Sequence, residues 1–338
     1  MKEILKQLCA KNGVPGYEDE VRECIRQMVE PYADEIIEDH LGNLLVLKKG
    51  KQPRKAPMMV CAHMDEVGFL ISRITSDGMF KIVPSGGIDP RVLVGRRMEV
   101  GPQKVPGVIS LKAIHLTTPE ERKVAPGFDT LYIDIGASSQ EDALKLVSPG
   151  DRAVICGEYT DAGDKIKSKA LDNRIGCAVL ISMLLKEAEY DFYAVFSAQE
   201  EVGLRGAKAA AYTAAPDAAR VLEGTTAADI AGVEPSRRVC VLGGGPAVSF
   251  MDRATVYDKA YYNAALKSGI TCQPKAAVAG GNNSGAVHTS RGGVRTLAIS
   301  VPCRYIHSPA SVADKCDIEN ALRLAEYMLK GICSGEIE

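Results

Sequence analysis

The sequence contains no tryptophan and only 5% aromatic residues, and this shortage disfavours one class of enzyme. Clefts that hold sugars commonly stack them on aromatic rings, so a glycoside hydrolase would lack its usual contacts. Cysteine is plentiful, with ten residues, but no C-x-x-C pair is present. Several cysteines lie in apolar runs, where a thiol behaves as a small hydrophobic side chain. We therefore expect reduced thiols and a cytoplasmic protein.

An excess of charge of one sign and long apolar runs are also missing. Lys and Arg number 41 against 43 Asp and Glu, and the net charge of −2 without a basic block argues against nucleic acid as a partner. No stretch reaches the ~18 apolar residues that a membrane span requires, and residues 1–11 form an amphipathic pattern rather than the apolar core of a secretion signal. We expect no nucleic-acid or membrane partner. The 338 residues suffice for two domains, or for one large domain with an insertion.

Strand-like and helix-like segments alternate along most of the chain. Apolar residues spaced three and four apart predict helices, and continuous apolar runs predict buried strands. The predicted helices cover residues 1–11, 17–32, 174–187, 203–213, 254–269 and 318–332. The predicted strands cover residues 35–38, 43–47, 57–62, 191–198, 219–223, 238–249 and 295–301, the first two as a hairpin. This order predicts an α/β fold with one mixed sheet covered by helices.

The pattern changes between residues 68 and 156. Short β-type runs are broken there by turn signals such as Asp77-Gly78, Gly86-Gly87 and Pro126-Gly127. The runs cover residues 69–74, 80–83, 97–100, 104–109 and 131–135. Strands at this spacing predict a small β-barrel or sandwich inserted into the larger unit. We therefore divide the chain into a main domain of residues 1–67 and 157–338 and an inserted β-rich domain of residues 68–156.

Two adjacent carboxylates, Glu200 and Glu201, follow the predicted strand of residues 191–198. Carboxylates at the mouth of a buried strand are costly unless a cation or a proton compensates them. Because neighbouring side chains diverge, one of the two can bind metal while the other handles protons. The alternative is a solvated strand end before a helix whose first turn favours acidic residues.

Four further candidates lie at or near predicted strand ends, and each also has an ordinary explanation. His63 has Asp65 two residues later, which can hold the second ring nitrogen of a ligating imidazole, although a lone histidine is more often simply buried. Asp172 is equally well explained as the N-cap of the next helix, Glu223 as a solvated strand end and His307 as a loop histidine.

Taken together, these residues indicate a metal site. Open α/β sheets place their ligands at the carboxyl ends of the strands, so the donors would converge at one edge. The donors are His63, Asp172, Glu201, Glu223 and His307. Two histidines with three carboxylates suit zinc, cobalt or manganese. One carboxylate bridging two ions, with a histidine and a second carboxylate on each, is the layout of a two-metal hydrolytic site.

Five segments also resemble the M42 family of metallo-aminopeptidases. This family includes glutamyl aminopeptidases and the tetrahedral TET peptidases, and some members are labelled endoglucanases. The segments are AHMDEVG (62–68), KALDNRIG (169–176), AQEEVGLRGA (198–207), VLEGTTAAD (221–229) and PCRYIHSP (302–309). They occur in the family's order over nearly the whole chain. The resemblance implies that the main domain is a catalytic metallopeptidase domain, that the insertion is a PDZ-like dimerisation domain, and that dimers assemble into dodecamers.

The resemblance also implies how the metal ligands are shared. Two divalent ions per subunit are expected, zinc or cobalt, with manganese as a further possibility. His63, Asp172 and Glu223 would hold one ion, and Asp172 would bridge to the second ion, held also by Glu201 and His307.

One segment departs from the family pattern. Many relatives have a Gly-Gly-Thr-Asp run where this chain reads Gly280-Gly281-Asn282-Asn283-Ser284, so an amide replaces a carboxylate at Asn283. This region lies near the active site in the family. We therefore do not infer the substrate specificity of this chain from that of any one relative. The metal ligands themselves match.

The sequence thus predicts an aminopeptidase acting on oligopeptides, with a metal-bridged water as nucleophile. By the resemblance, Glu200 is the general base and acid, taking the proton of the water and passing it to the leaving amine, and Asp65 supports His63. One alternative is an endoglucanase-like glycoside hydrolase, which would use paired carboxylates without metal. A second is a non-catalytic metal-binding assembly protein, against which Glu200 argues because a structural site needs no proton acceptor.

Overall fold

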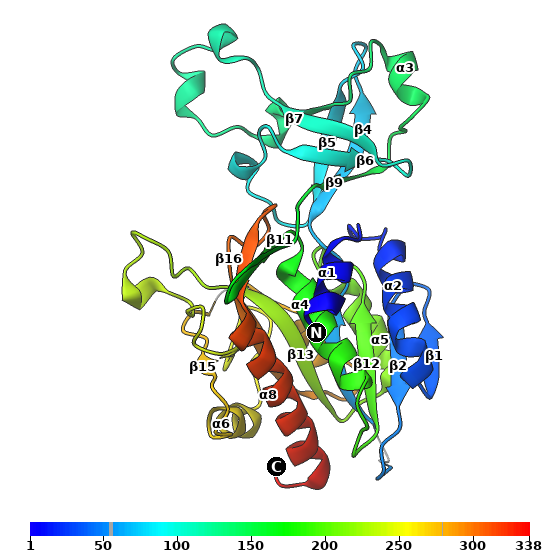
Figure 1. Cartoon of the computed structure of the whole chain (residues 1–338), viewed down its shortest axis with the longest axis vertical. Coiled ribbons are helices and arrows are strands. Elements are labelled where there is room, and N and C mark those ends of the chain that lie inside the picture. Colours follow the sequence, from blue (N-terminus) through cyan, green and yellow to red (C-terminus); the bar gives the residue numbers. More distant parts are fainter. Residues whose placement is uncertain (54–56, 279) are drawn as a thin grey trace.

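The computed structural model describes residues 1–53, 57–278 and 280–338, which form a large layered domain and a small barrel (Figure 1). The strands of the large sheet are β1 (Glu35–Glu38), β2 (Leu44–Lys48), β3 (Met58–His63), β10 (Thr160–Ala162), β11 (Lys165–Ser168), β12 (Phe192–Ser197), β13 (Ala218–Thr226), β14 (Ala247–Val248), β15 (Gln273–Pro274), β16 (Arg295–Arg304) and β17 (Ser311–Asp314). Their order is β1-β2-β12-β3-β13-β16-β17-β11-β10, with β14 paired to β16 and β15 to β14. The four central strands, β12, β3, β13 and β16, run parallel to one another, and the outer pairs are antiparallel.

Helices cover both faces of this sheet, which is why its central strands are continuous apolar runs. The helical elements of the large domain are α1 (Lys2–Cys9), α2 (Asp19–Val29), η1 (Glu30–Tyr32), α4 (Leu171–Leu184), α5 (Arg205–Ala214), η6 (Pro235–Arg237), α6 (Lys259–Leu266), α7 (Ser284–Val287) and α8 (Lys315–Ser334). Residues of α1, α2, α4 and α8 share one hydrophobic core with the sheet, and residues of α5 and α7 share another. The sheet therefore lies between two helical layers.

The second core identifies which strand positions face α5 and α7. It contains Met59 and Cys61 of β3, Val195 of β12 and Val221 of β13. Since side chains alternate along a strand, residues two positions further on point to the same face. His63, Ser197 and Glu223 therefore lie on the α5–α7 side of the sheet, near its carboxyl edge.

The barrel lies at the top of Figure 1, beyond the carboxyl ends of the central strands. Its strands are β4 (Gly68–Ile74), β5 (Phe80–Ser85), β6 (Arg97–Val100), β7 (Val105–Ser110), β8 (Tyr132–Asp134) and β9 (Arg152–Ile155), closed in the order β4-β5-β8-β7-β6-β9. Its helical elements are η2 (Pro90–Val92), η3 (Ile114–Leu116), η4 (Glu121–Lys123), η5 (Phe128–Thr130) and α3 (Gln140–Leu144). The barrel has its own apolar core. The predicted fold class, a mixed α/β sheet covered by helices with an inserted small β-barrel, is confirmed.

Two segments differ from the sequence-based prediction. The predicted strands over 238–249 reduce to β14, because the amides of Gly243 and Gly245 donate to the carboxylate of Asp317 and form a loop. The predicted helix from residue 254 begins only at Lys259, since the carboxylate of Asp252 accepts the amides of the next residues and forms a turn. In both places a buried aspartate competes with regular backbone pairing.

Among the residues that the structure describes, none of the helices has the length and apolarity needed to cross a membrane.

Candidate active site

All five predicted donors meet at the carboxyl edge of the central strands. His63 ends β3, Glu223 lies near the end of β13, and Glu201 is four residues beyond β12. His307 follows β16, and Asp172 lies in the first turn of α4. Asp172 and Asn173 have non-helical backbone angles, and Oδ1 of Asn173 accepts the amide of Gly176 at 3.0 Å. Asn173, not Asp172, therefore caps the helix, and the capping explanation does not describe Asp172.

The donor atoms fall into two groups that share Asp172. Nε2 of His63 lies 3.3 Å from Oδ1 of Asp172 and 3.4 Å from Oε2 of Glu223. Nε2 of His307 lies 3.3 Å from Oδ2 of Asp172 and 3.2 Å from Oε1 of Glu201. Ligand atoms around one tetrahedral ion with bonds of about 2.0–2.1 Å lie roughly 3.3 Å apart. The spacing therefore fits two cations bridged by the Asp172 carboxylate.

Several of these oxygens have no hydrogen-bond donor in the described part of the chain. They are Oδ1 of Asp172, Oε1 of Glu201 and Oε1 of Glu223, and all three are buried. Buried carboxylate oxygens without partners are costly unless a cation compensates them. The donor set thus has the chemistry of a metal site.

The electrostatics of the cluster agree with its geometry. Burial opposes a charge on both histidines, but the surrounding carboxylates outweigh it, raising the pKa of His63 well above its ordinary value and that of His307 to about 11. Burial raises the pKa of Glu223 to about 7 and also raises the pKa of Glu201. Burial acts in the same direction on Asp172, but the two histidines beside its carboxylate hold its pKa below the usual value. The cluster therefore has a strong negative potential, which cations would neutralise.

Glu200 lies beside the same cluster. Donor atoms of His63, Glu200 and Glu223 all lie within 4.8 Å of one another, as do those of His63, Asp172 and Glu201. Burial raises the pKa of Glu200 well above its ordinary value, and the charges of Glu223 and Glu201 add to this effect while His63 opposes it. A buried carboxyl group with a raised pKa is suited to accept and return a proton near neutral pH.

Asp65 supports both His63 and the two glutamates. Nδ1 of His63 lies 3.1 Å from the backbone carbonyl of Asp65 and 3.3 Å from its carboxylate. The carboxylate oxygens of Asp65 accept the backbone amides of Glu200 and Glu201, each at 3.0 Å. Gln199, just before these glutamates, has φ of +54°, a left-handed conformation that the Asp65 bonds help to hold.

The structure also contains contacts that the sequence did not indicate. The carbonyl of Gly87, from the barrel, lies 2.7 Å from Nδ1 of His307 and leaves Nε2 facing the carboxylates. Nδ2 of Asn173 donates to Oε2 of Glu223 at 3.1 Å, and Oδ1 of Asn43 accepts the amide of Ala198 at 2.8 Å. The turn signal at Gly86-Gly87 was visible in the sequence, but nothing in it pointed to His307.

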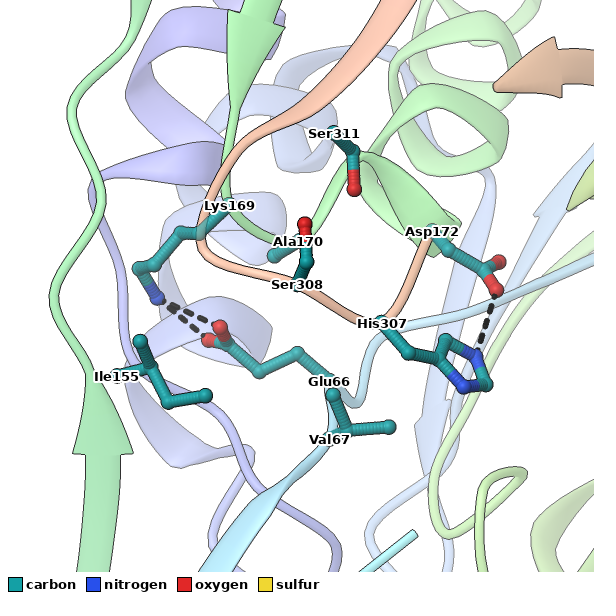
Figure 2. Close-up of a pocket in the computed structure, with 9 residues that line it drawn as sticks. All are labelled: Glu66, Val67, Ile155, Lys169, Ala170, Asp172, His307, Ser308 and Ser311. Carbon is teal, nitrogen blue, oxygen red and sulfur yellow. Dashed lines mark hydrogen bonds and ion pairs between the residues drawn. The ribbon is translucent and has the colours of Figure 1, made fainter. Parts of the chain in front are cut away.

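A small pocket lies beside the cluster of donor residues (Figure 2). Asp172 and His307 form one side of it, and the buried ion pair of Lys169 with Glu66 forms the other. Nζ of Lys169 lies 2.7 and 2.8 Å from the two carboxylate oxygens of Glu66. The remaining lining residues are Val67, Ile155, Ala170, Ser308 and Ser311. A buried ion pair therefore forms one wall of a pocket that opens next to the Asp172 carboxylate.

Comparison with known families and curated proteins finds relatives along nearly the whole chain. The family model described as M42 glutamyl aminopeptidase matches residues 42–324. A putative aminopeptidase of Acetivibrio thermocellus is 38% identical, covering 98% of this chain and 98% of the relative. A glutamyl aminopeptidase of Lactococcus lactis is 33% identical, covering 91% of this chain and 90% of the relative.

Solved structures give the same result. The TET aminopeptidase of the Thaumarchaeota archaeon SCGC AB-539-E09 superposes with a TM-score of 0.92 at 33% identity, covering 97% of this chain and 95% of that chain. The TET1 peptidase of Pyrococcus horikoshii, described as able to assemble into a tetrahedron or a large octahedral shell, has a TM-score of 0.84 at 33% identity, covering 97% and 98%.

Proposed function

This chain belongs to the M42 family and is an aminopeptidase, a hydrolase of peptide bonds, and from this premise we propose that it releases N-terminal residues from oligopeptides at a two-metal site. The observation that carries the proposal is the pair of donor groups bridged by Asp172, with histidine-to-carboxylate distances of 3.2–3.4 Å.

We assign the ligands from the two donor groups, whose spacing supports this proposal. His63, Asp172 and Glu223 would hold one ion, and Asp172, Glu201 and His307 would hold the other. The set of two imidazoles and three carboxylates suits zinc or cobalt, and also manganese. When bound, two such ions supply Lewis acidity that activates water and polarises the scissile carbonyl.

Glu200 provides the acid–base chemistry of the reaction. Its carboxylate takes a proton from the attacking water and then returns it to the leaving amine. The raised pKa of Glu200, caused first by burial, makes its carboxylate a stronger base than an exposed glutamate. Asp65 holds the backbone amides of Glu200 and Glu201 and thereby keeps the proton acceptor and the adjacent ligand in fixed positions.

A Glu200→Gln variant tests this assignment. We expect kcat on aminoacyl-anilides to fall by about 10²- to 10⁴-fold, since general acid–base catalysis contributes rate enhancements of this order. The metal content should stay at two ions per subunit, because Glu200 is not assigned as a ligand. The exposed Glu141→Gln in α3 is the matched control and should retain full activity. A Glu200→Gln protein that loses its metal together with activity, or that keeps near-normal turnover, contradicts the proposed role.

We assign self-association to the inserted domain, residues 68–156, and expect dimers that build a dodecamer. The P. horikoshii relative is described as forming closed shells, and Ile114 and Val124 of the barrel are 72% and 73% exposed. An interface at this part of the inserted domain would bury both side chains. The cytoplasm is the proposed compartment, because all ten cysteines are free thiols.

We do not retain the glycoside hydrolase and assembly-protein alternatives. The family and the named relatives are aminopeptidases. Furthermore, the donors converge at distances suited to metal binding, whereas glycosidase carboxyls lie roughly 5–10 Å apart across a sugar cleft.

A further inference from the structure

Three polar residues form a row across the carboxyl edge of the sheet, on the face toward α5 and α7. Ser197 of β12 pairs in register with His63 of β3. Cys61 of β3 pairs with Val221 of β13. His63 lies two residues after Cys61, and Glu223 lies two residues after Val221, so these two residues are neighbours on the same face. The row therefore runs Ser197–His63–Glu223 over three adjacent strands. Two of its members are proposed metal ligands.

Asn283 covers this row. Its side chain is fully buried, and Nδ2 donates to Oγ of Ser197 at 2.9 Å and lies 3.8 Å from Sγ of Cys61. Its backbone N–H faces the Glu223 carboxylate closely enough to oppose the rise in the pKa of Glu223 that burial causes. One residue thus contacts both outer members of the row. No donor in the described residues reaches Oδ1 of Asn283, so the side chain is held through Nδ2 alone.

The backbone of Asn283 is fixed from both sides. The preceding residue, Asn282, donates from Nδ2 to Oδ2 of Asp252 at 3.1 Å and to the hydroxyl of Tyr257 at 2.9 Å. On the other side, the amides of Ala286 and Val287 in α7 donate to the carbonyl of Asn283 at 3.1 and 3.0 Å. This anchoring keeps the backbone N–H of Asn283 directed at Glu223, while the side-chain amide reaches Ser197.

We propose that Asn283 is a positioning residue that ties Glu223 to the end of β12 and so holds this ligand against His63. The proposal rests on the two-metal function proposed above. It concerns the ion assigned to His63, Asp172 and Glu223, because the contacts of Asn283 lie on the row Ser197–His63–Glu223.

Asn283 contributes a hydrogen bond to this edge of the sheet and no charge. Asp65, Asp172, Glu200, Glu201 and Glu223 already bring five carboxylates to this edge of the sheet. An amide makes the contact with Ser197 without adding a sixth. Residues that orient metal ligands typically contribute 10- to 100-fold to metal affinity or activity.

The test is a titration of metal-free protein with Co²⁺, followed by calorimetry and by visible absorption. The unmodified protein should bind two ions. In Asn283→Ala, we expect roughly tenfold weaker binding of one ion and binding of the other within about twofold of the unmodified protein. The visible absorption band of Co²⁺ at the site with weakened binding should change as well. With both sites loaded, kcat should fall while KM stays within about twofold, since Asn283 touches a metal ligand rather than the substrate.

Two further variants make the result specific. Asn283→Asp keeps the side-chain size and can accept the Ser197 hydroxyl proton, so its Co²⁺ affinity should be at least that of the unmodified protein. Asn320→Ala deletes another buried amide, one that contacts Cys316 within α8, and should leave both Co²⁺ affinities unchanged.

Equal weakening of both ions in Asn283→Ala, or the same change in Asn320→Ala, would overturn the positioning role. A loss of Co²⁺ affinity in Asn283→Asp as large as that in Asn283→Ala would overturn it too. If Asn283→Ala does not fold, the Co²⁺ affinity of Asn283→Asp decides the question. Failure of the unmodified protein to bind two ions would instead overturn the proposed function.

Discussion

At the residue scale, the active site depends on neighbouring acids that have different partners. Glu200 and Glu201 are adjacent, yet only Glu201 lies at ligand distance from His307, at 3.2 Å. Their backbone amides are both held by Asp65. Adjacent residues point in different directions, so one residue step is enough to separate the metal binding proposed for Glu201 from the proton transfer proposed for Glu200.

Glu18 is a further buried acid near this loop, and it makes stability depend on pH. Its Oε1 accepts the amides of Gly16 and Gln199, at 2.9 and 3.0 Å. Burial, followed by the charge of Asp65, raises the pKa of Glu18 to about 7. The folded protein therefore keeps a proton that the unfolded chain loses near its ordinary pKa of 4.5. The stabilisation from this carboxyl is complete below that pH and is lost as pH rises to about 7.

Replacing Glu18 by Gln should remove this dependence. Between pH 5 and pH 7, the stability of the unmodified protein should fall relative to that of Glu18→Gln, by about 2 kcal/mol. The measurement is thermal or denaturant unfolding of both proteins at pH 5, 6 and 7. Parallel pH profiles for the two proteins would show that Glu18 does not titrate in this range.

At the element scale, a buried ion cluster joins the N-terminal helices to the start of α4. Glu66 bonds Lys169 and Arg174, with Oε1 lying 2.7 and 3.1 Å from their nitrogens. Arg174 is fully buried and also donates to the carbonyls of Met64 and Leu8, at 2.9 and 2.6 Å. The first turn of α4, which carries the bridging Asp172, is thus fixed by contacts from two other segments.

Glu66→Gln should be strongly destabilising. It would leave two buried cations without a carboxylate, and breaking a buried ion pair in this way costs about 3–5 kcal/mol. Denaturant unfolding measures the loss. The matched control is Glu326→Gln, which breaks the more exposed ion pair with Lys186 and should cost under about 1 kcal/mol. A loss of that small size for Glu66→Gln would mean that the cluster does not hold α4 in place.

At the scale of the whole molecule, the barrel contributes to the active site while also extending away from the sheet. Its Gly87 carbonyl orients His307, so the site includes a residue from the inserted segment. The far part of the barrel carries exposed apolar residues at Ile114, Leu116 and Val124. We expect this surface to form the contacts of the proposed assembly.

Light scattering should therefore give a particle mass twelve times the 36.1 kDa of the chain. The double variant Ile114→Asp/Val124→Asp should form a smaller species with an unchanged circular dichroism spectrum, because burying two unpaired carboxylates in a contact is unfavourable. Tyr212→Asp, at a 67% exposed position on α5, is the control and should keep the full mass. An unchanged mass for the double variant would place the contacts elsewhere.

Much of the fold could be predicted from local sequence patterns. The apolar run before His63 and the helix after Asp172 are set by periodicity, which depends on neighbouring residues. The predictions were wrong where a distant acid intervened, as when Asp317 bound the amides of Gly243 and Gly245 and no strand formed there. The five donors and Glu200 could be proposed from the ends of strands and from motif order.

The sequence by itself determined the family, the fold class and the set of candidate ligands, because these depend on residue types at fixed spacings along the chain. Only the tertiary structure decided which oxygen faces which histidine, that Asp65 holds the amides of Glu200 and Glu201, and that Asn283 contacts Ser197. Asn283 and Cys61 are 222 residues apart in sequence. Contacts of this kind arise when the sheet brings distant segments to one edge, and no local pattern encodes them.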